Sequence, residues 1–137
     1  MRKQNIAVTL DPVIFYRKAR VFNVLLIKRK NEPFRDHWSL PGGFLEEDET
    51  MMEGAKRELE EETGLKIEKL QQVGAFGTPG RDPRGRTISI AFVGLIDAEA
   101  KVKASDDAVD AKWFSLNDLP DLAFDHREII SLAHSFL

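Results

Sequence analysis

Three glutamates near the middle of the chain, Glu58, Glu61 and Glu62, are spaced three and four residues apart. If this segment is helical, that spacing places the three carboxylates on one face of the helix. Such a cluster disfavours an isolated helix, because like charges repel and negative charge near the C-terminus opposes the helix dipole. A divalent cation such as Mg²⁺ or Mn²⁺ would reverse that penalty, since it prefers carboxylate oxygens as ligands. The spacing therefore predicts a metal site, with a solvated, metal-free helix face as the alternative.

A helix over residues 50–63 would position these carboxylates. Thr50 and Glu53 fit a capping box at its start, and Gly64 stands where a glycine commonly ends a helix. Four residues form the stripe expected to face the core: Met52, Ala55, Leu59 and Thr63. Gly54 falls on the same side as the glutamates, so we expect an open notch beside them.

Charge is unevenly distributed along the 137 residues. Residues 45–62 carry nine acids and two bases, a net charge of −7, whereas the whole chain carries only −3. An acidic segment in an otherwise mildly basic chain favours a metal facing an anionic ligand, although a solvated acidic helix face is the alternative. The chain has no cysteine, which excludes disulfides, thiolate zinc sites and a cysteine nucleophile. Its net negative charge and short apolar runs predict a cytoplasmic protein that binds neither nucleic acid nor membrane.

The surrounding elements alternate between strand and helix signals. Apolar runs predict strands at residues 6–16, 21–29, 67–76, 87–96 and 110–114, with a turn at 17–20 and loops at 30–43 and 77–86. A terminal helix is expected from about Asp125, where Asp125 and Glu128 fit a second capping box. His126 and His134 on that helix are expected to be surface-exposed or partly packed. This order predicts one α+β or mixed α/β domain over residues 1–137, with the helices packed on a mixed sheet.

The segment from Gly43 to Leu65 resembles the Nudix hydrolase box, G-x5-E-x7-R-E-U-x-E-E-x-G-U, where U is apolar, and it matches every specified position. A chance match in a chain of this length is on the order of 10⁻⁸. The resemblance implies an α/β/α sandwich, a homodimer and Mg²⁺- or Mn²⁺-dependent hydrolysis of nucleoside diphosphate derivatives. It also implies residue roles. The metal ligands would be Glu58, Glu61, Glu62 and the carbonyl of Gly42, while Arg57 and Glu49 would orient the carboxylates.

The second loop carries the clue to the substrate. Pro79 and the run Arg81-Asp82-Pro83-Arg84-Gly85 resemble the corresponding loop of ADP-ribose pyrophosphatases. We therefore expect a nucleotide substrate, most simply ADP-ribose cleaved to AMP and ribose 5-phosphate. The expected substrate-binding residues are Arg29, Arg81, Arg84, Phe34 and His37, with the two aromatic rings stacking on adenine. The alternatives are a rigid surface loop or a dimer contact for residues 77–86, and a core position for the aromatic rings.

The general base and the exact activity remain open at this stage. Glu61 is favoured as the base because it lies between two predicted metal ligands on a rigid helix, whereas Asp106 and Asp107 are short side chains on a loop. Two other functions compete with ADP-ribose hydrolysis. One is a nucleotide pyrophosphatase acting on nucleoside triphosphates or dinucleotides. The other is an ADP-ribose-sensing domain of a transcription regulator, which the intact box and the end of the chain after its terminal helix disfavour.

Overall fold

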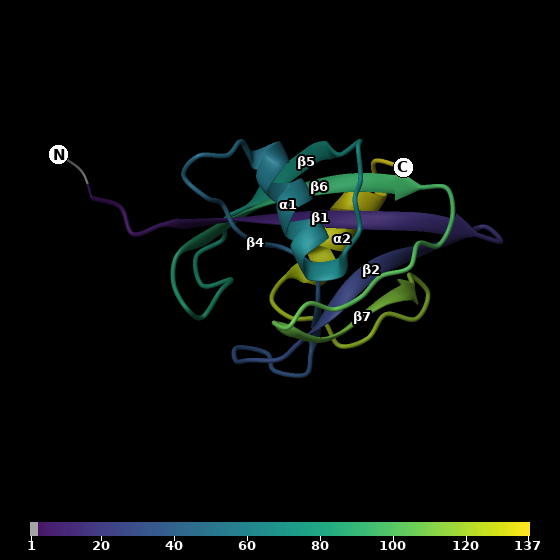
Figure 1. Ribbon diagram of the computed structural model, residues 1–137. Coiled ribbons are helices and arrows are strands. Elements are labelled where there is room, and N and C mark those ends of the chain that lie inside the picture. Colours follow the sequence, from purple (N-terminus) through teal and green to yellow (C-terminus); the bar gives the residue numbers. More distant parts are fainter. Residues whose placement is uncertain (1–2) are drawn as a thin grey trace.

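The computed structural model describes residues 3–137 (Figure 1). Its elements are β1 (Ala7–Lys18), β2 (Val21–Arg29), β3 (Trp38–Ser39), β4 (Gly43–Phe44), α1 (Met51–Thr63), β5 (Gln71–Phe76), β6 (Thr87–Ile96), β7 (Ala108–Ser115) and α2 (His126–His134). The strand and helix order matches the expected α+β architecture. In this part of the chain no helix is long and apolar enough to cross a membrane.

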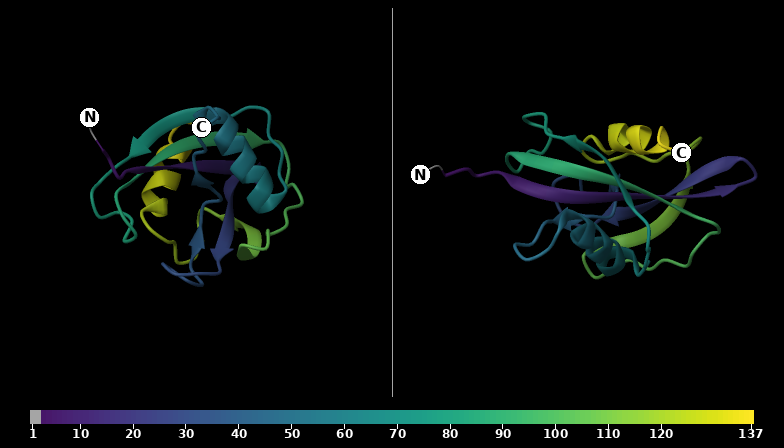
Figure 2. Two further views of the ribbon diagram at one scale, coloured as in Figure 1. Left: turned by 60° about the vertical axis from the view of Figure 1, so that its left-hand side comes forward. Right: turned by 90° about the horizontal axis from the view of Figure 1, so that it is seen from above.

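The strands form one mixed sheet between the two helices. Its order is β3-β2-β1-β6-β5, with β4 paired to β1 and β7 paired to β2. The β1–β6 pair is parallel, and the other strand pairs are antiparallel. The right-hand view of Figure 2 shows α1 and α2 on opposite sides of the strands, which confirms the predicted α/β/α sandwich.

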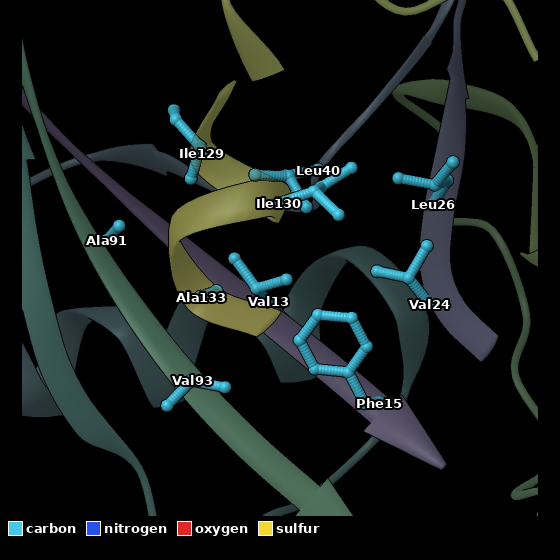
Figure 3. Packing of buried hydrophobic residues seen from close by; sticks show 10 residues of the cluster. All are labelled: Val13, Phe15, Val24, Leu26, Leu40, Ala91, Val93, Ile129, Ile130 and Ala133. Carbon is cyan, nitrogen blue, oxygen red and sulfur yellow. The ribbon is translucent and has the colours of Figure 1, made fainter. Parts of the chain in front are cut away.

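Alternation along β1 assigns its side chains to the two helices. Leu10 and Ile14 belong to the clusters that contain Ala55 and Leu59 of α1. Val13 and Phe15 pack in the larger cluster with α2 residues, as Figure 3 shows. Successive strand residues point to opposite faces, so both faces of β1 are buried and the strand reads as a continuous apolar run.

The site lies where β1 and β2 diverge. The two strands pair from Phe15 opposite Val24 to Lys18 opposite Val21, but nearer its start β1 pairs with β4 instead. Beyond that point β2 pairs with β3 at Ile27 and Lys28, while β7 pairs along β2 from Asn23 to Arg29. The sheet therefore forks on this side of β1. The first half of β1 and the second half of β2 do not pair with each other, and the space between them is open.

Local signals fixed the helix ends with one exception. Thr50 and Glu53 form the predicted capping box, and Gly64 ends α1 with a left-handed φ of 76°. The predicted capping box at α2 is wrong, because the Asp125 side chain makes no capping hydrogen bond. Its carboxylate is instead bound to Arg81 from the loop before β6.

Several strand boundaries also differ from expectation, among them those of β7, which was predicted over 110–114 and runs over Ala108–Ser115. The first hairpin turns at Ala19 and Arg20, both with positive φ, so β1 runs on to Lys18 rather than ending at Tyr16. Positive φ at two central residues is the geometry of a tight two-residue hairpin. The strand predicted from residue 67 begins only at Gln71, while Ile67 and Leu70 pack against Ile14 and Leu59 from outside the sheet.

Candidate active site

A cavity opens at the fork of the sheet and is bordered by all the elements that meet there. It is lined by Thr9 and Asp11 from β1, Ile27 and Arg29 from β2, Ser39 and Leu40 at β3, Gly42 to Phe44 at β4, Glu62 from α1, Arg81, Asp82 and Arg84 from the second loop, Asp107 before β7, and Phe124 and His126 at α2. Lys30, Asn31 and Ser89 complete the lining. The cavity thus brings Glu62 of the box segment and Arg81 and Arg84 of the second loop into one space.

Arg57 organises the acidic side of the site. Its Nε and Nη2 donate to the two carboxylate oxygens of Glu49 over 2.8 and 2.7 Å. Its Nη1 donates to Glu58 over 2.9 Å and to Glu61 over 3.0 Å. The hydrogen bonds from Arg57 hold the pKa of Glu49 down at about 2. The same contact with Glu49 is the main cause that raises the pKa of Arg57. The geometry suits the orienting role predicted for Arg57 and Glu49.

Burial raises the pKa of two carboxylates of α1, Glu58 and Glu62. The Glu58 residue is 8% exposed, and burial raises its pKa despite the hydrogen bond from Arg57. Burial also raises the pKa of Glu62, and the negative charge of Glu58 raises it further. Two carboxylates that disfavour each other's charge in a half-buried setting are a fitting donor set for a hard divalent cation.

The turn before β4 fits the same interpretation. A Cβ atom at Gly43 would lie 2.6 Å from the Glu58 carboxylate, so only glycine lets the backbone approach this close. Gly42 and Glu62 both line the cavity. Glu58, Glu62 and the Gly42 carbonyl are therefore the groups that would hold a metal, as the box resemblance implies.

Glu61 is placed differently from its two neighbours. Its side chain is 58% exposed, its carboxylate is bound by Arg57, and it is not part of the cavity lining. Within residues 3–137 no three His, Asp or Glu side chains are gathered closely enough to hold a metal by themselves. The structure therefore buries the Glu58 carboxylate against Gly43, brings Glu62 to the cavity wall and leaves Glu61 exposed beside Arg57.

The notch expected at Gly54 is filled. A Cβ atom there would collide with the Leu10 side chain and would lie 2.7 Å from Glu49 Oε1. Gly54 is buried, and the missing side chain lets α1 pack closely on β1 while Glu49 reaches across to Arg57. The notch is therefore a packing feature and leaves no open space beside the glutamates.

The three predicted arginines all line the cavity, with different degrees of freedom. Arg81 donates to Asp125 through Nε over 2.8 Å and through Nη2, and its side chain is 5% exposed. Arg84 donates to Asp82 over 3.1 and 2.8 Å and is 45% exposed. Arg29 donates from Nε to the Pro33 carbonyl over 2.7 Å, and burial lowers its pKa. Arg84 is therefore the arginine of the loop most open to a ligand.

Two phenylalanines line the cavity, Phe44 and Phe124, and the sequence prediction named neither. Phe34 and His37 do not line the cavity; Phe34 packs edge-on against Phe124, with the ring centres 4.8 Å apart. The guanidinium groups of Arg29 and Arg84 lie 5.0 and 5.5 Å from the centre of the Phe124 ring. Phe124 has a positive φ of 53°, an uncommon backbone state for a bulky residue and one that often marks functional sites.

Two further lining residues were not singled out as site residues. Asp11 is 5% exposed in the middle of an otherwise apolar strand. His126, expected at the surface or partly packed, is 6% exposed because the start of α2 is tucked against β3, where Leu40 N–H donates to its Nδ1 over 3.0 Å. The only sequence signal for Asp11 was a charged residue interrupting an apolar run. His134 is exposed, with its ring against Phe22, which agrees with the expectation.

The loop before β7 packs against the C-terminal end of α1. Ser105 N–H donates to the Glu62 carbonyl over 3.2 Å, and Ser105 Oγ donates to the Glu62 carboxylate over 3.3 Å. Asp107 lines the cavity, whereas Asp106 does not; the Asp106 carbonyl accepts a bond from Lys30 Nζ. Of the two loop candidates for the general base, Asp107 is therefore the one facing the site.

Comparisons with known proteins agree with this geometry. The profile of the NUDIX domain matches residues 10–133, and the chain belongs to that family. It is 51% identical over 107 residues to the ADP-ribose pyrophosphatase of Methanocaldococcus jannaschii, covering 78% of this chain and 63% of that protein. It is 36% identical to the ADPR responsive transcriptional repressor NtrR of Acinetobacter baylyi, covering 94% of this chain and 53% of the repressor.

A solved structure shows the same fold in a ligand-bound relative. The NUDIX domain of Shewanella oneidensis NrtR complexed with ADP ribose superposes with a TM-score of 0.91 at 31% identity, covering 98% of this chain and 90% of that one. The chain spans between half and two thirds of the length of the two curated relatives above. Membership of the family and the fold are thus established.

Proposed function

We propose that this chain is a Mg²⁺- or Mn²⁺-dependent hydrolase that cleaves ADP-ribose to AMP and ribose 5-phosphate. The observation that carries the proposal is a cavity whose wall holds Glu62 together with Arg29, Arg81 and Arg84, with the Glu58 carboxylate against Gly43 of the same wall. Carboxylates that favour a cation and arginines that favour phosphate oxygens are the two halves of a diphosphate site. The 51% identity to an ADP-ribose pyrophosphatase supports the choice of substrate.

The residues of the chain divide the work as follows. Glu58, Glu62 and the Gly42 carbonyl would hold the cation, which when bound neutralises diphosphate charge and activates water. Arg57, held by Glu49, keeps Glu58 in place, and Arg84 contacts the diphosphate from the open side. Arg81 is tied to Asp125 and shapes the wall, with its guanidinium facing the same cavity.

Proton removal from the attacking water is proposed for one of two carboxylates. Glu61 stays our first prediction because its helix position fixes it next to Glu62, although Arg57 holds its carboxylate. Asp107 is the alternative, since it lines the cavity beside Glu62. A base must come within about 3 Å of the water or reach it through one bridging water, so the two candidates require different movements.

A second candidate function is ADP-ribose sensing without turnover. It is favoured by the similarity to the ADPR responsive repressor over 94% of this chain and to the ADP ribose-bound NrtR domain. The same cavity would serve, because binding of ADP-ribose needs the arginines and aromatic wall but not activation of water. The two functions therefore differ in product formation rather than in ligand affinity.

A substrate panel separates these functions. The purified chain is incubated with Mg²⁺ or Mn²⁺ and with ADP-ribose, a deoxynucleoside triphosphate or a dinucleoside polyphosphate, and the products are separated by ion-exchange chromatography. We expect AMP and ribose 5-phosphate from ADP-ribose at the highest kcat/KM. A higher kcat/KM for the triphosphate would identify that nucleotide, rather than ADP-ribose, as the substrate. Micromolar binding of ADP-ribose without product formation would identify a sensor. Glu60→Gln, on an exposed position of the same helix, is the matched control for Glu58→Gln.

A further inference from the structure

One carboxylate in the cavity wall is not accounted for by the fold or by the proposed metal site. Asp11 is 5% exposed and lines the cavity, yet its Oδ2 has no hydrogen-bond partner among residues 3–137. Buried carboxylate oxygens are nearly always bonded, because an unpaired one loses its hydration without compensation. An oxygen left in this state inside a cavity indicates a partner that enters the cavity from outside.

The nearest charged groups do not supply that partner. Arg81 lies close enough for Asp11 to raise its pKa, but its Nε and Nη2 are both engaged by Asp125. Thr9, the neighbouring side chain on the same face of β1, is bonded to Ser89 over 2.6 Å. On the other side, Gly42 approaches Asp11 so closely that a Cβ atom would lie 2.7 Å from its Oδ1. The surroundings thus hold Asp11 in position while leaving Oδ2 unpaired.

His126 supplies the complementary group in the same wall. Its Nδ1 accepts the Leu40 N–H bond, so the neutral ring carries its hydrogen on Nε2. Burial lowers the pKa of His126, which keeps the ring neutral near pH 7. Nε2 makes no hydrogen bond within the described part of the chain, and it is therefore a donor of fixed tautomer. The wall offers one acceptor, at Asp11, and one donor, at His126.

We propose that Asp11 and His126 determine specificity by reading a donor–acceptor edge of the bound nucleotide, an inference that rests on the proposed binding of ADP-ribose. Asp11 accepts a hydrogen bond from the ligand, and His126 Nε2 donates one to an adjacent ligand acceptor. Phe124, with its ring centre 5.2 Å from that of His126, provides an apolar face for a planar ring beside them. ADP-ribose carries this donor–acceptor pattern twice: on the adenine edge, as an amine beside a ring nitrogen, and on the terminal ribose, as neighbouring hydroxyls.

Calorimetric binding of three ligands to Asp11→Asn tests the proposal without requiring turnover. The ligands are ADP-ribose, AMP and the hypoxanthine analogue IDP-ribose, measured in Ca²⁺ buffer. Asp121→Asn, at an exposed position outside the cavity, is the matched control. We expect Asp11→Asn to weaken ADP-ribose binding at least tenfold and the control to bind as the unmodified chain does.

The ligand series identifies the edge that is read. If AMP weakens in parallel and the preference for ADP-ribose over IDP-ribose is lost, the adenine edge is bound. If AMP is unaffected while ADP-ribose and IDP-ribose weaken equally, the terminal ribose is bound. Unchanged affinity of a folded Asp11→Asn for all three ligands would overturn the proposal.

A measurement on the unmodified chain guards against misfolding of the variant. The Nε2 and Nδ1 resonances of ¹⁵N-labelled His126 should shift on saturation with ADP-ribose, whereas those of exposed His134 should not. Absence of a His126 shift under saturating ADP-ribose would also overturn the proposal. If ADP-ribose binds and shifts the His126 resonances but is not hydrolysed, the proposed hydrolase function is wrong, while the proposed role of Asp11 and His126 in recognising the ligand is retained. If ADP-ribose does not bind at all, both fail.

Discussion

The guanidinium of Arg57 and the carboxylate of Glu49 are joined by two hydrogen bonds, of 2.8 and 2.7 Å, that link the loop before α1 to the middle of that helix. The same guanidinium reaches Glu58, so the loop, the helix and a proposed metal ligand form one connected unit. A planar, bidentate contact of this kind fixes orientation as well as charge, which a lysine could not reproduce.

This contact predicts how stability depends on acidity. The pKa of Glu49 in the folded chain is about 2, below its ordinary value of 4.5, so its contribution to stability is fully present above pH 4.5 and is lost as the pH falls towards 2. Urea unfolding should show a smaller loss of stability across this window for Glu49→Gln than for the unmodified chain. Glu47→Gln, which alters an exposed acid of the same loop, should follow the unmodified curve. Parallel curves for all three would contradict the assignment.

Changing Glu58 or Glu62 to Gln should lower kcat at least a hundredfold at saturating metal. That loss corresponds to about 2.7 kcal/mol of transition-state stabilisation. Each change preserves size and removes one ligand charge from the proposed metal site. Steady-state kinetics with ADP-ribose provide the measurement, with Glu60→Gln as the control expected to retain its rate. Near-normal turnover of Glu58→Gln would refute its role as a ligand.

Metal binding should also be visible in stability. Because burial raises the pKa of Glu62, its charged form destabilises the metal-free fold near pH 7, and Glu62→Gln should raise the Tm measured without metal. Mn²⁺ should raise the Tm of the unmodified chain by binding only the folded state, and this gain should shrink in the variant. Equal gains in both proteins would place the metal elsewhere.

The two arginines of the second loop that line the cavity should behave differently. Arg81→Ala leaves the carboxylate of Asp125 without its partner, and we expect a loss of about 2–3 kcal/mol of stability, less than for a fully buried pair because Asp125 is 23% exposed. Arg84→Ala should change stability little and raise the KM for ADP-ribose, since its side chain is open to the cavity. Chemical denaturation and kinetics on both variants check this, with exposed Arg127→Ala as the control. An unchanged KM for Arg84→Ala would remove it from the substrate site.

The identity of the general base is decided by kcat at saturating metal and substrate. If Glu61 is the base, Glu61→Gln should lose a hundredfold or more while Asp107→Asn and Asp106→Asn stay within a few-fold. Asp106 serves as the control for Asp107, because it lies on the same loop outside the cavity lining. A thousandfold loss confined to Asp107→Asn would assign the base to the loop.

The box helix was determined by the sequence itself. Its capping box, its C-terminal glycine and the shared face of Glu58 and Glu62 all follow from contacts within a few residues, which helical periodicity fixes. Of the four interior positions predicted on that helix, Ala55, Leu59 and Thr63 are buried for the same reason, and Met52 is partly buried. The five longer strands were equally readable, because alternation and apolar runs are local signals. The two-residue strands β3 and β4 were not predicted, since residues 30–43 were expected to form a loop.

The cavity was decided by the tertiary structure. Asp11 and His126 are far apart in sequence, and they share a wall only because β1 leaves β2 at Phe15 and the start of α2 is tucked against β3. The same fork places Phe124 rather than Phe34 at the wall and draws Asp125 away from its capping position to Arg81. Sequence spacing fixes which residues share an element, but it does not fix where two strands separate. That separation depends on long-range pairing of the whole sheet, and it determines which side chains meet in the site.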